Sequence, residues 1–323
     1  MRAVHVSAAG SPEVLRVVEI DRPEPGRGEV LVAVEAAAVI FGDVMVRSGA
    51  YPWKFPYVPG IEVGGQVVAV GPDADPALNG RWVVATTPGM TGGYAQFARV
   101  EAASVHLVPE GLPLDEAVAV FQAGGLAAGI LGALRVGAQD SVLITAAAGR
   151  IGSLLVQLAR ARGARTVIGA VGSEGKLPAV WGNGVDLAVD YSDPGWIEKV
   201  TKQTGGEGVD VVLDAIGGSL RSQAMKTAAA GTGRIGVYGF AGGETSIDTV
   251  DISARGLTVV GALGVVWARP EDEQRADVEN ALKAAAAGDL VPTIHRGYPL
   301  EKAPEAHAEL EGRRNIGAIL LHP

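Results

Sequence analysis

The segment 142–163 restricts the possible folds more than any other part of the chain. Residues 142–144 form an apolar run typical of a buried strand, and a glycine-containing turn follows immediately. Beyond the turn, apolar residues recur at helical spacing from Ile151 to Leu158, and Gly163 is a typical helix stop. A strand, a tight turn and a helix in this order form the first half of a βαβ unit, which predicts a parallel sheet.

The alternation of strands and helices continues to about residue 289. Further strands are predicted at residues 166–170, 187–189, 209–214, 234–238 and 257–262. A helix is predicted at residues 271–287, because Pro270 and acidic residues mark its start and Gly288 follows it. Residues 120–289 are therefore expected to form a doubly wound α/β domain.

Residues 1–119 have a different, β-rich pattern. Short strand-like runs, separated by turn signals, occur at residues 30–39, 65–70, 82–85 and 94–100. Such a pattern predicts a compact, barrel-like β domain. Residues 290–323 return to β character punctuated by proline and are expected to rejoin this domain. Between the two domains, residues 114–134 are predicted to be helical, with an interruption at Gly124 and Gly125.

Composition and charge exclude several classes of function. The net charge of −9, without a visible basic cluster, argues against nucleic acid as a partner. No apolar stretch is expected to reach the roughly 18–20 residues of a membrane-spanning helix. The first residues lack the apolar region of a signal peptide, so a cytoplasmic location is expected. The absence of cysteine excludes disulfides and Cys-ligated metals, and the histidines lack ligand spacing, so no metal is expected.

The turn after residues 142–144 has the composition of a dinucleotide site. It reads Ala147-Ala148-Gly149-Arg150-Ile151-Gly152. A pyrophosphate needs backbone N–H groups, the positive end of a helix and no obstructing side chain. Gly149 permits the close approach and Gly152 lets the helix pack on the strand, while Ala147 replaces the usual first glycine. The alternative is a glycine-containing turn without a ligand, as in any α/β protein.

The next strand indicates which dinucleotide is bound. NAD sites place an acidic residue near its end, where it accepts hydrogen bonds from the ribose 2′-hydroxyl. Here the strand ends in Gly172 and Ser173 without an acid, and Lys176 and Tyr191 follow. Because a 2′-phosphate requires a cation and hydroxyl donors, NADPH is favoured over NADH. The alternative is that Lys176 is an ordinary surface lysine beside Glu174.

Several motifs carry a resemblance to a known family. They are the segment 142–190, Arg47-Ser48-Gly49-Ala50-Tyr51-Pro52, Val58-Pro59-Gly60-Ile61-Glu62 and Gly93-Tyr94-Ala95-Gln96. Over nearly its whole length, the chain resembles the zinc-independent quinone oxidoreductase family of the medium-chain dehydrogenase/reductase superfamily. The resemblance implies a GroES-like catalytic domain, residues 1–119 and 290–323, and a Rossmann NADP-binding domain, residues 120–289. It also implies reduction of quinones, enones or enoyl thioesters, often by homodimers.

The resemblance extends the expected cofactor site and identifies departures from the family pattern. It adds Gly217, Tyr238, Phe240, Leu263, Val265 and Asn315 to the turn residues and to Ser173, Lys176 and Tyr191. The family's asparagine near the nicotinamide is Ile40, its tyrosine three residues before Ser48 is Met45, and its threonine in the segment 125–128 is Ala127. The positions where zinc-dependent relatives carry ligands read Phe41, Gly42 and Ile61. The part of the site that the resemblance places near the nicotinamide ring has thus lost these polar side chains.

The polar residues that remain near the expected nicotinamide position are the candidates for catalysis. Tyr51 is the candidate donor to the enolate oxygen that develops when hydride reaches a conjugated carbonyl. Asp43 and Glu62 organise the cleft or, as the alternative, form a buried structural pair. Aromatic side chains are expected to line an apolar pocket or, equally, to pack in the core or an interface: Trp53, Phe55, Tyr57, Phe240 and Trp267.

Two other functions remain open on the same scaffold. An enoyl-thioester or biosynthetic double-bond reductase would need basic residues at the cleft mouth for a carrier's phosphate. The candidates are Arg47, Lys54, Arg269, Arg313 and Arg314. A descendant that binds NADPH without hydride transfer, as a regulator or a repurposed cyclase, is suggested by Ile40, Met45 and Ala127. A homodimer through an apolar edge strand at residues 256–266 is also expected.

Overall fold

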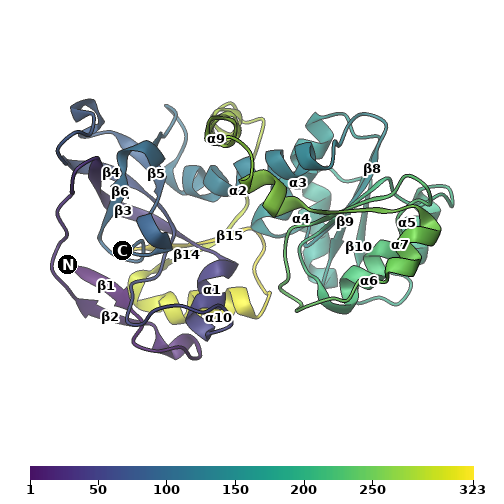
Figure 1. Cartoon of the computed structure of the whole chain (residues 1–323), viewed down its shortest axis with the longest axis horizontal. Helices are drawn as coiled ribbons and strands as arrows, with labels where there is room; N and C mark the ends of the chain where they lie inside the picture. Colours follow the sequence, from purple (N-terminus) through teal and green to yellow (C-terminus); the bar gives the residue numbers. More distant parts are fainter. The chain divides into compact units, whose positions relative to one another are not determined.

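The computed structural model describes all 323 residues, which form two compact units (Figure 1). Unit 1 comprises Met1–Gln122 and Leu282–Pro323, and unit 2 comprises Ala123–Ala281. Helices α2 (Leu114–Ala133) and α9 (Glu271–Ala286) each contain one of the unit boundaries. Each unit has its own sheet and its own core, so the two are described in turn.

Unit 2 contains a six-stranded sheet in the order β10-β9-β8-β11-β12-β13, with every neighbouring pair parallel. Its strands are β8 (Ser141–Thr145), β9 (Thr166–Val171), β10 (Leu187–Asp190), β11 (Val211–Asp214), β12 (Arg234–Val237) and β13 (Thr258–Gly261). Its other helices are α3 (Arg150–Ala161), α4 (Leu177–Gly182), α5 (Trp196–Gln203), α6 (Gly218–Lys226), α7 (Thr249–Arg255) and α8 (Ala262–Trp267). The predicted parallel, doubly wound sheet is confirmed, and its strand order reverses between β8 and β11.

The core of unit 2 explains why these strands lack polar alternation. All five residues of β8 and all four of β11 are buried, because helices cover both faces of a parallel sheet. Leu143, Ile168, Val212 and Ile235, one from each of four adjacent strands, belong to one apolar cluster with Trp196 of α5. Burying each such side chain stabilises the fold by about 1.5–3 kcal/mol.

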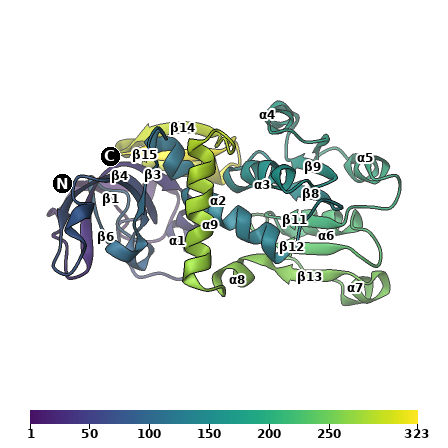
Figure 2. The same cartoon turned by 90° about the horizontal axis from the view of Figure 1, so that it is seen from above.

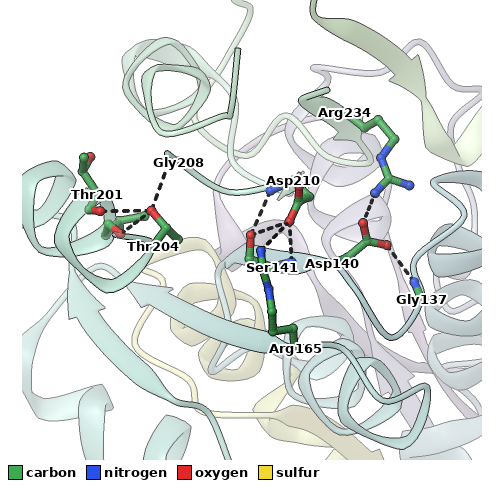
Figure 3. A network of polar contacts seen from close by, with 10 residues as sticks. Gly137, Asp140, Ser141, Arg165, Thr201, Thr204, Gly208, Asp210 and Arg234 are labelled. Atoms are coloured by element: carbon green, nitrogen blue, oxygen red, sulfur yellow. Dashed lines mark hydrogen bonds and ion pairs between the residues drawn. The ribbon is translucent and has the colours of Figure 1, made fainter. Parts of the chain in front are cut away.

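Polar side chains tie together the amino-terminal ends of these strands (Figure 3). Asp210, just before β11, accepts hydrogen bonds from the Ser141 backbone N–H at 2.8 Å and hydroxyl at 2.7 Å, and pairs with Arg165. Asp140, just before β8, pairs with Arg234 of β12 and accepts the Gly137 N–H. This edge of the sheet is closed by its own residues, so the carboxyl ends remain for ligand-binding loops.

Unit 1 is built around the long, central strand β3 (Glu29–Val39). The order of its main sheet is β14-β15-β3-β4-β5-β7, and β6 also pairs with β3. The strands are β4 (Glu62–Val70), β5 (Trp82–Thr86), β6 (Phe97–Glu101), β7 (His106–Leu107), β14 (Ile294–Pro299) and β15 (Ala318–His322), with a separate hairpin of β1 (Arg2–His5) and β2 (Arg16–Glu19). Because β15 pairs antiparallel with β3, the C-terminal segment completes this sheet. Helices α1 (Phe41–Ser48) and α10 (Ala303–Glu311) lie side by side (Figure 1).

Helix α2 contradicts two sequence-based expectations. It runs without a break through Gly124 and Gly125. A Cβ at Gly125 would lie 2.6 Å from the Val278 side chain of α9. The small residue there permits close helix packing instead of ending the helix. The expectation that no segment is long and apolar enough to cross a membrane is also wrong for α2. About 67% of its apolar window is buried inside the structure, as in the core helix of a globular protein.

Two further segments differ from their predicted form. The expected edge strand at residues 256–266 is only β13, and the chain then turns into α8; Figure 2 shows β13 between α7 and α8. Residues 303–311 form helix α10 within the region expected to be β-rich. The helix buries Ala303, Ala306 and His307 at a spacing of three and four residues, and this one-sided pattern was missed.

Candidate dinucleotide and substrate sites

The turn between β8 and α3 presents an uncapped helix terminus. The chain leaves β8 through Ala146, whose φ of +51° begins the tight turn, and Gly149 occupies the N-cap of α3. The N-cap residue Gly149 has no side chain to bond the first turn, so an anion can approach the backbone there at the positive end of the helix. Arg150 and Ile151 are the first two helical residues.

The two glycines of this turn have different structural roles. A Cβ at Gly152 would lie 2.1 Å from Ala146 O and 2.9 Å from Ala147 Cα, both backbone atoms. Only glycine therefore lets α3 pack this closely on the turn. A Cβ at Gly149 would meet only Ala146 O, at 3.2 Å, and its φ of −79° suits any residue. The fold requires glycine at 152, whereas the bare backbone at Gly149 favours close approach of a ligand.

The residues predicted to hold the 2′-phosphate gather at the carboxyl ends of β9 and β10. The Tyr191 N–H donates to Val171 O at 2.8 Å, which joins the two strand ends. The Tyr191 ring lies against Gly172, where a Cβ would be 2.7 Å from its hydroxyl. Ser173 is exposed beyond Gly172 and leads into the turn Glu174–Lys176. A serine hydroxyl and a lysine thus follow the end of β9, which carries no acid at residues 170–173, and the Tyr191 phenol follows Asp190 at the end of β10.

A buried ion pair organises the loops on the other side of the strand reversal. Asp214, fully buried at the end of β11, accepts hydrogen bonds from the Thr145 hydroxyl at 3.0 Å, the Gly217 N–H at 3.0 Å and Arg221 Nε at 2.7 Å. Arg221 also donates to Gly239 O at 2.6 Å. The pair therefore joins loops that follow β8, β11 and β12. Sequence reasoning missed this pair, although an acidic residue directly after an apolar strand is a usable signal.

Other predicted cofactor residues occupy the same end of the unit 2 sheet or helix α8. Tyr238, just past β12, is buried with its hydroxyl 3.4 Å from Thr145 O, and this burial raises its pKa. Phe240 is half exposed. In α8, Leu263 is partly buried, whereas Val265 and Trp267 are exposed. The remaining predicted residue, Asn315, belongs to unit 1, where its side-chain amide donates to Gly317 O at 2.8 Å.

In unit 1, the structure places Asp43 inside a buried polar cluster. Its carboxylate accepts hydrogen bonds from the Tyr94 hydroxyl at 2.9 Å and from the Ile40 N–H at 3.2 Å. The Tyr94 hydroxyl also lies 3.3 Å from Nε2 of His307. Burial raises the pKa of Asp43 to about 7, and Glu62 adds repulsion; burial, with Arg47 nearby, lowers the pKa of His307 to about 3.

This cluster holds the start of α1 in place. Asp43 is only 3% exposed, and its bond to the Ile40 N–H satisfies a backbone donor at the helix start. The geometry matches the structural alternative for Asp43 and Glu62, because neither carboxylate is open to solvent. Sequence reasoning did not find Tyr94 and His307 as partners, since 213 residues separate them.

Arg47 is not at a cleft mouth. Its side chain is 1% exposed, donates to Gly10 O at 2.7 Å and forms an ion pair with Glu311 of α10 at 2.7 Å. The expectation that it offers a free charge to a carrier's phosphate is therefore wrong, because burial and Glu311 already use that charge.

The aromatic segment after α1 forms a connected row. The ring centroids of Tyr51 and Trp53 are 6.4 Å apart, those of Trp53 and Tyr57 6.3 Å, and those of Phe55 and Tyr57 5.5 Å. Tyr51 is 51% exposed, so its hydroxyl is accessible from solvent. The structure thus groups Tyr51 with Trp53, whereas Phe240 and Trp267 belong to unit 2.

The three departures from the family pattern lie in different surroundings. Ile40 and Met45 are partly buried at the start and middle of α1. Ala127 is fully buried in α2. No three His, Cys, Asp or Glu residues lie together where they could hold a metal ion.

Comparisons with known proteins cover the whole chain. Residues 26–110 match the alcohol dehydrogenase GroES-like domain, and residues 151–286 match the zinc-binding dehydrogenase domain. The human quinone oxidoreductase is 32% identical over 330 residues, covering 99% of this chain and 97% of the human protein. The Escherichia coli quinone oxidoreductase complexed with NADPH superposes with a TM-score of 0.92 at 26% identity, and a mycobacterial protein complexed with NADPH with 0.90 at 30%. Both superpositions cover 100% of each chain.

Proposed function

Because this chain belongs to the quinone oxidoreductase family of the medium-chain dehydrogenases and reductases, we propose that it reduces quinones or α,β-unsaturated carbonyl compounds with NADPH and without a metal. Membership of this family makes the protein an oxidoreductase. Its preference for NADPH over NADH and the chemical class of its acceptor are our proposal. The observation that carries the proposal is the uncapped terminus of α3, with Ser173, Lys176 and Tyr191 near the acid-free end of β9.

These residues fit a nicotinamide dinucleotide that carries a 2′-phosphate. The N–H groups at the start of α3 would bind the pyrophosphate, and Gly149 leaves room for it. Ser173, Lys176 and Tyr191 would bind the 2′-phosphate, with Lys176 supplying the positive charge. Similar proteins solved with NADPH support this choice. When bound, the cofactor supplies the hydride.

The chain's own contribution to the reaction is to bind the acceptor and polarise it. Tyr51 would donate a hydrogen bond to the carbonyl oxygen on which negative charge develops, and water would deliver the final proton. The side chain of Tyr51 is half exposed, which allows such a contact, and the Trp53 ring beside it offers an apolar wall. Because Ile40 and Met45 have no hydroxyl or amide, Tyr51 is the polar group left to that role among these family positions.

The test is NADPH oxidation, followed by absorbance, with a panel of quinones and enones. Replacing Tyr51 with Phe should lower kcat/KM about 100- to 1,000-fold, since a hydrogen bond aimed at a developing oxyanion is worth about 2.7–4 kcal/mol. The affinity for NADPH should not change. Tyr57→Phe is the matched control, because the Tyr57 hydroxyl is buried without a hydrogen-bond partner. Unchanged turnover by Tyr51→Phe removes Tyr51 from the mechanism, and tighter binding of NADH than of NADPH refutes the cofactor assignment.

A non-redox function is the second candidate, and the apolar Ile40 and Met45 favour it. A non-redox protein should bind NADPH tightly, and no acceptor in the panel should oxidise the bound NADPH.

We also propose a homodimer through β13, because this strand lies at the sheet edge with one side unpaired within the chain. Light scattering distinguishes the dimer from a monomer. The Thr258 N–H donates to Gly233 O within the sheet, so the next N–H along the strand, that of Val259, faces the open edge. Substituting Val259 with Pro removes this donor and should weaken the dimer.

A further inference from the structure

Unit 1 contains an open pocket beside the aromatic segment that includes Tyr51. Its volume is about 630 Å³, and it is lined by Pro52, Trp53, Lys54, Gly89 and Thr91. Small-molecule sites in proteins typically occupy about 300–1,000 Å³. One wall follows α1 directly in sequence, and the other is the glycine-containing segment that follows β5.

The wall at residues 88–91 is held by backbone and side-chain bonds. Gly89 and Met90 both have positive φ, at +62° and +58°, so the chain turns sharply there. The Thr87 hydroxyl donates to Gly60 O at 2.9 Å, and the Met90 N–H donates to Thr87 O at 3.2 Å. On the far side, the Gly92 N–H donates to Val58 O at 2.8 Å. These bonds fix the course of residues 87–92 beside the pocket.

Lys54 supplies the only charged side chain in the lining. It is exposed, and the structure gives its ammonium group no ion pair or hydrogen bond. Three of the other candidate cations are already paired with carboxylates: Arg47 with Glu311, Arg269 with Glu273 and Asp277, and Arg314 with Glu309. In a chain with a net charge of −9, Lys54 is thus an unpaired positive charge beside the Trp53 side chain in the pocket lining.

We propose that this pocket binds the anionic tail of the acceptor, with a flat apolar group against Trp53 and a carboxylate or phosphate at Lys54. The inference rests on the proposed function, because it places the reducible carbonyl toward Tyr51, whose ring lies 6.4 Å from that of Trp53. The substrate class is therefore a conjugated carbonyl compound that carries an anionic group. A carboxylate would be part of a small free acid, and a phosphate would belong to a thioester carrier.

Calorimetric titration of the full chain tests the pocket without any turnover. The probes are 2-naphthoate, 2-naphthyl phosphate and the neutral 2-naphthamide, and the protein is the wild type, Lys54→Gln, Lys54→Arg or Lys283→Gln. Lys283 is the matched control, an exposed lysine of α9 outside the pocket. We expect Lys54→Gln to weaken binding of the anions about fivefold at low salt, with naphthamide unaffected and Lys54→Arg close to the wild type. Stronger binding of naphthyl phosphate than of naphthoate favours the carrier.

Equal affinity of the wild type and Lys54→Gln for both anions overturns the proposal, as does the absence of anion binding to the wild type. In a second measurement, kcat/KM for 3-benzoylacrylate, a conjugated ketone with a carboxylate, should fall about fivefold in Lys54→Gln, while its neutral methyl ester is unaffected. If neither compound is reduced although naphthoate binds at Lys54, the proposed function fails and the pocket stands. If both compounds are reduced without any dependence on Lys54, the proposed function stands and the pocket assignment fails.

Discussion

Alanine substitution at the two glycines of the β8–α3 turn separates ligand binding from folding. In Gly152→Ala, the new Cβ would be 2.1 Å from Ala146 O and 2.9 Å from Ala147 Cα, so α3 must move away from the turn. Overpacking of this kind costs about 1–3 kcal/mol, and the better helix propensity of alanine returns at most about 1 kcal/mol. Because the clash is with backbone atoms, the upper end of this range applies, and we expect a net loss of about 2–3 kcal/mol in the free energy of unfolding, with weaker NADPH binding as a consequence.

In Gly149→Ala, the new Cβ has only one close neighbour, Ala146 O at 3.2 Å, and the backbone φ of −79° is unstrained. The free energy of unfolding should change by less than about 1 kcal/mol. The same methyl group would project where the pyrophosphate is proposed to approach. We therefore expect the Kd for NADPH to rise at least about tenfold, equivalent to about 1.4 kcal/mol.

Urea unfolding and calorimetric titration with NADPH, performed on both variants, measure the two effects separately. The expected result is a stable Gly149→Ala protein that binds NADPH poorly, beside a destabilised Gly152→Ala protein. A folded Gly149→Ala protein with wild-type NADPH affinity would refute the assignment of the α3 terminus as the pyrophosphate site. A Gly152→Ala protein as stable as the wild type would refute the packing argument.

Three other substitutions test the 2′-phosphate site, the buried ion pair of unit 2 and the raised pKa of Asp43. Lys176→Gln should raise the Kd for NADPH about tenfold and leave that for NADH unchanged in the same titration; an equal loss for both cofactors contradicts the 2′-phosphate assignment. Arg221→Met leaves the Asp214 carboxylate buried without its ion-pair partner, so the free energy of unfolding in urea should fall by about 3–5 kcal/mol. A fall of less than about 1 kcal/mol contradicts the structural role of this pair. Burial raises the Asp43 pKa from 3.8 to about 7, so its contribution to stability is complete below pH 3.8 and is lost as the pH rises through 7. Between pH 4 and 7 the wild type should therefore lose stability relative to Asp43→Asn, and parallel profiles over this range contradict the raised pKa.

The parallel sheet and the dinucleotide turn could be predicted because their determinants are contiguous in sequence. The apolar strand, the turn and the amphipathic helix follow one another within residues 141–161, and β8 and α3 lie where this local pattern places them. The acid-free end of β9 is equally local. A ligand site built from backbone N–H groups at the end of a strand thus leaves its signal in a short stretch of chain.

The features that were missed depend on contacts between residues distant in sequence. Glycine at position 125 lets α2 pack closely against Val278, 153 residues later in the sequence. Asp43 acquires its buried surroundings from Tyr94 and His307, and helix α10, which carries the histidine, was itself predicted as β structure. Charge alone was also misleading at Arg47, because only the fold shows its pairing with Glu311. Local patterns do not contain these contacts.

The two parts of the proposed site are constrained by different kinds of interaction, and this difference bears on substrate choice. In unit 2, backbone geometry at Gly152 and the buried ion pair of Asp214 and Arg221 fix the loops, so side-chain changes there endanger the fold. In unit 1, the bond from the Ile40 N–H to Asp43 holds the start of α1 through the backbone, whatever side chain residue 40 carries. Ile40 can therefore replace a polar residue without loss of the helix start. Selection for a new acceptor would act on such side chains, and we expect acceptor preference to depend on residues 40–54 while the cofactor site stays unchanged.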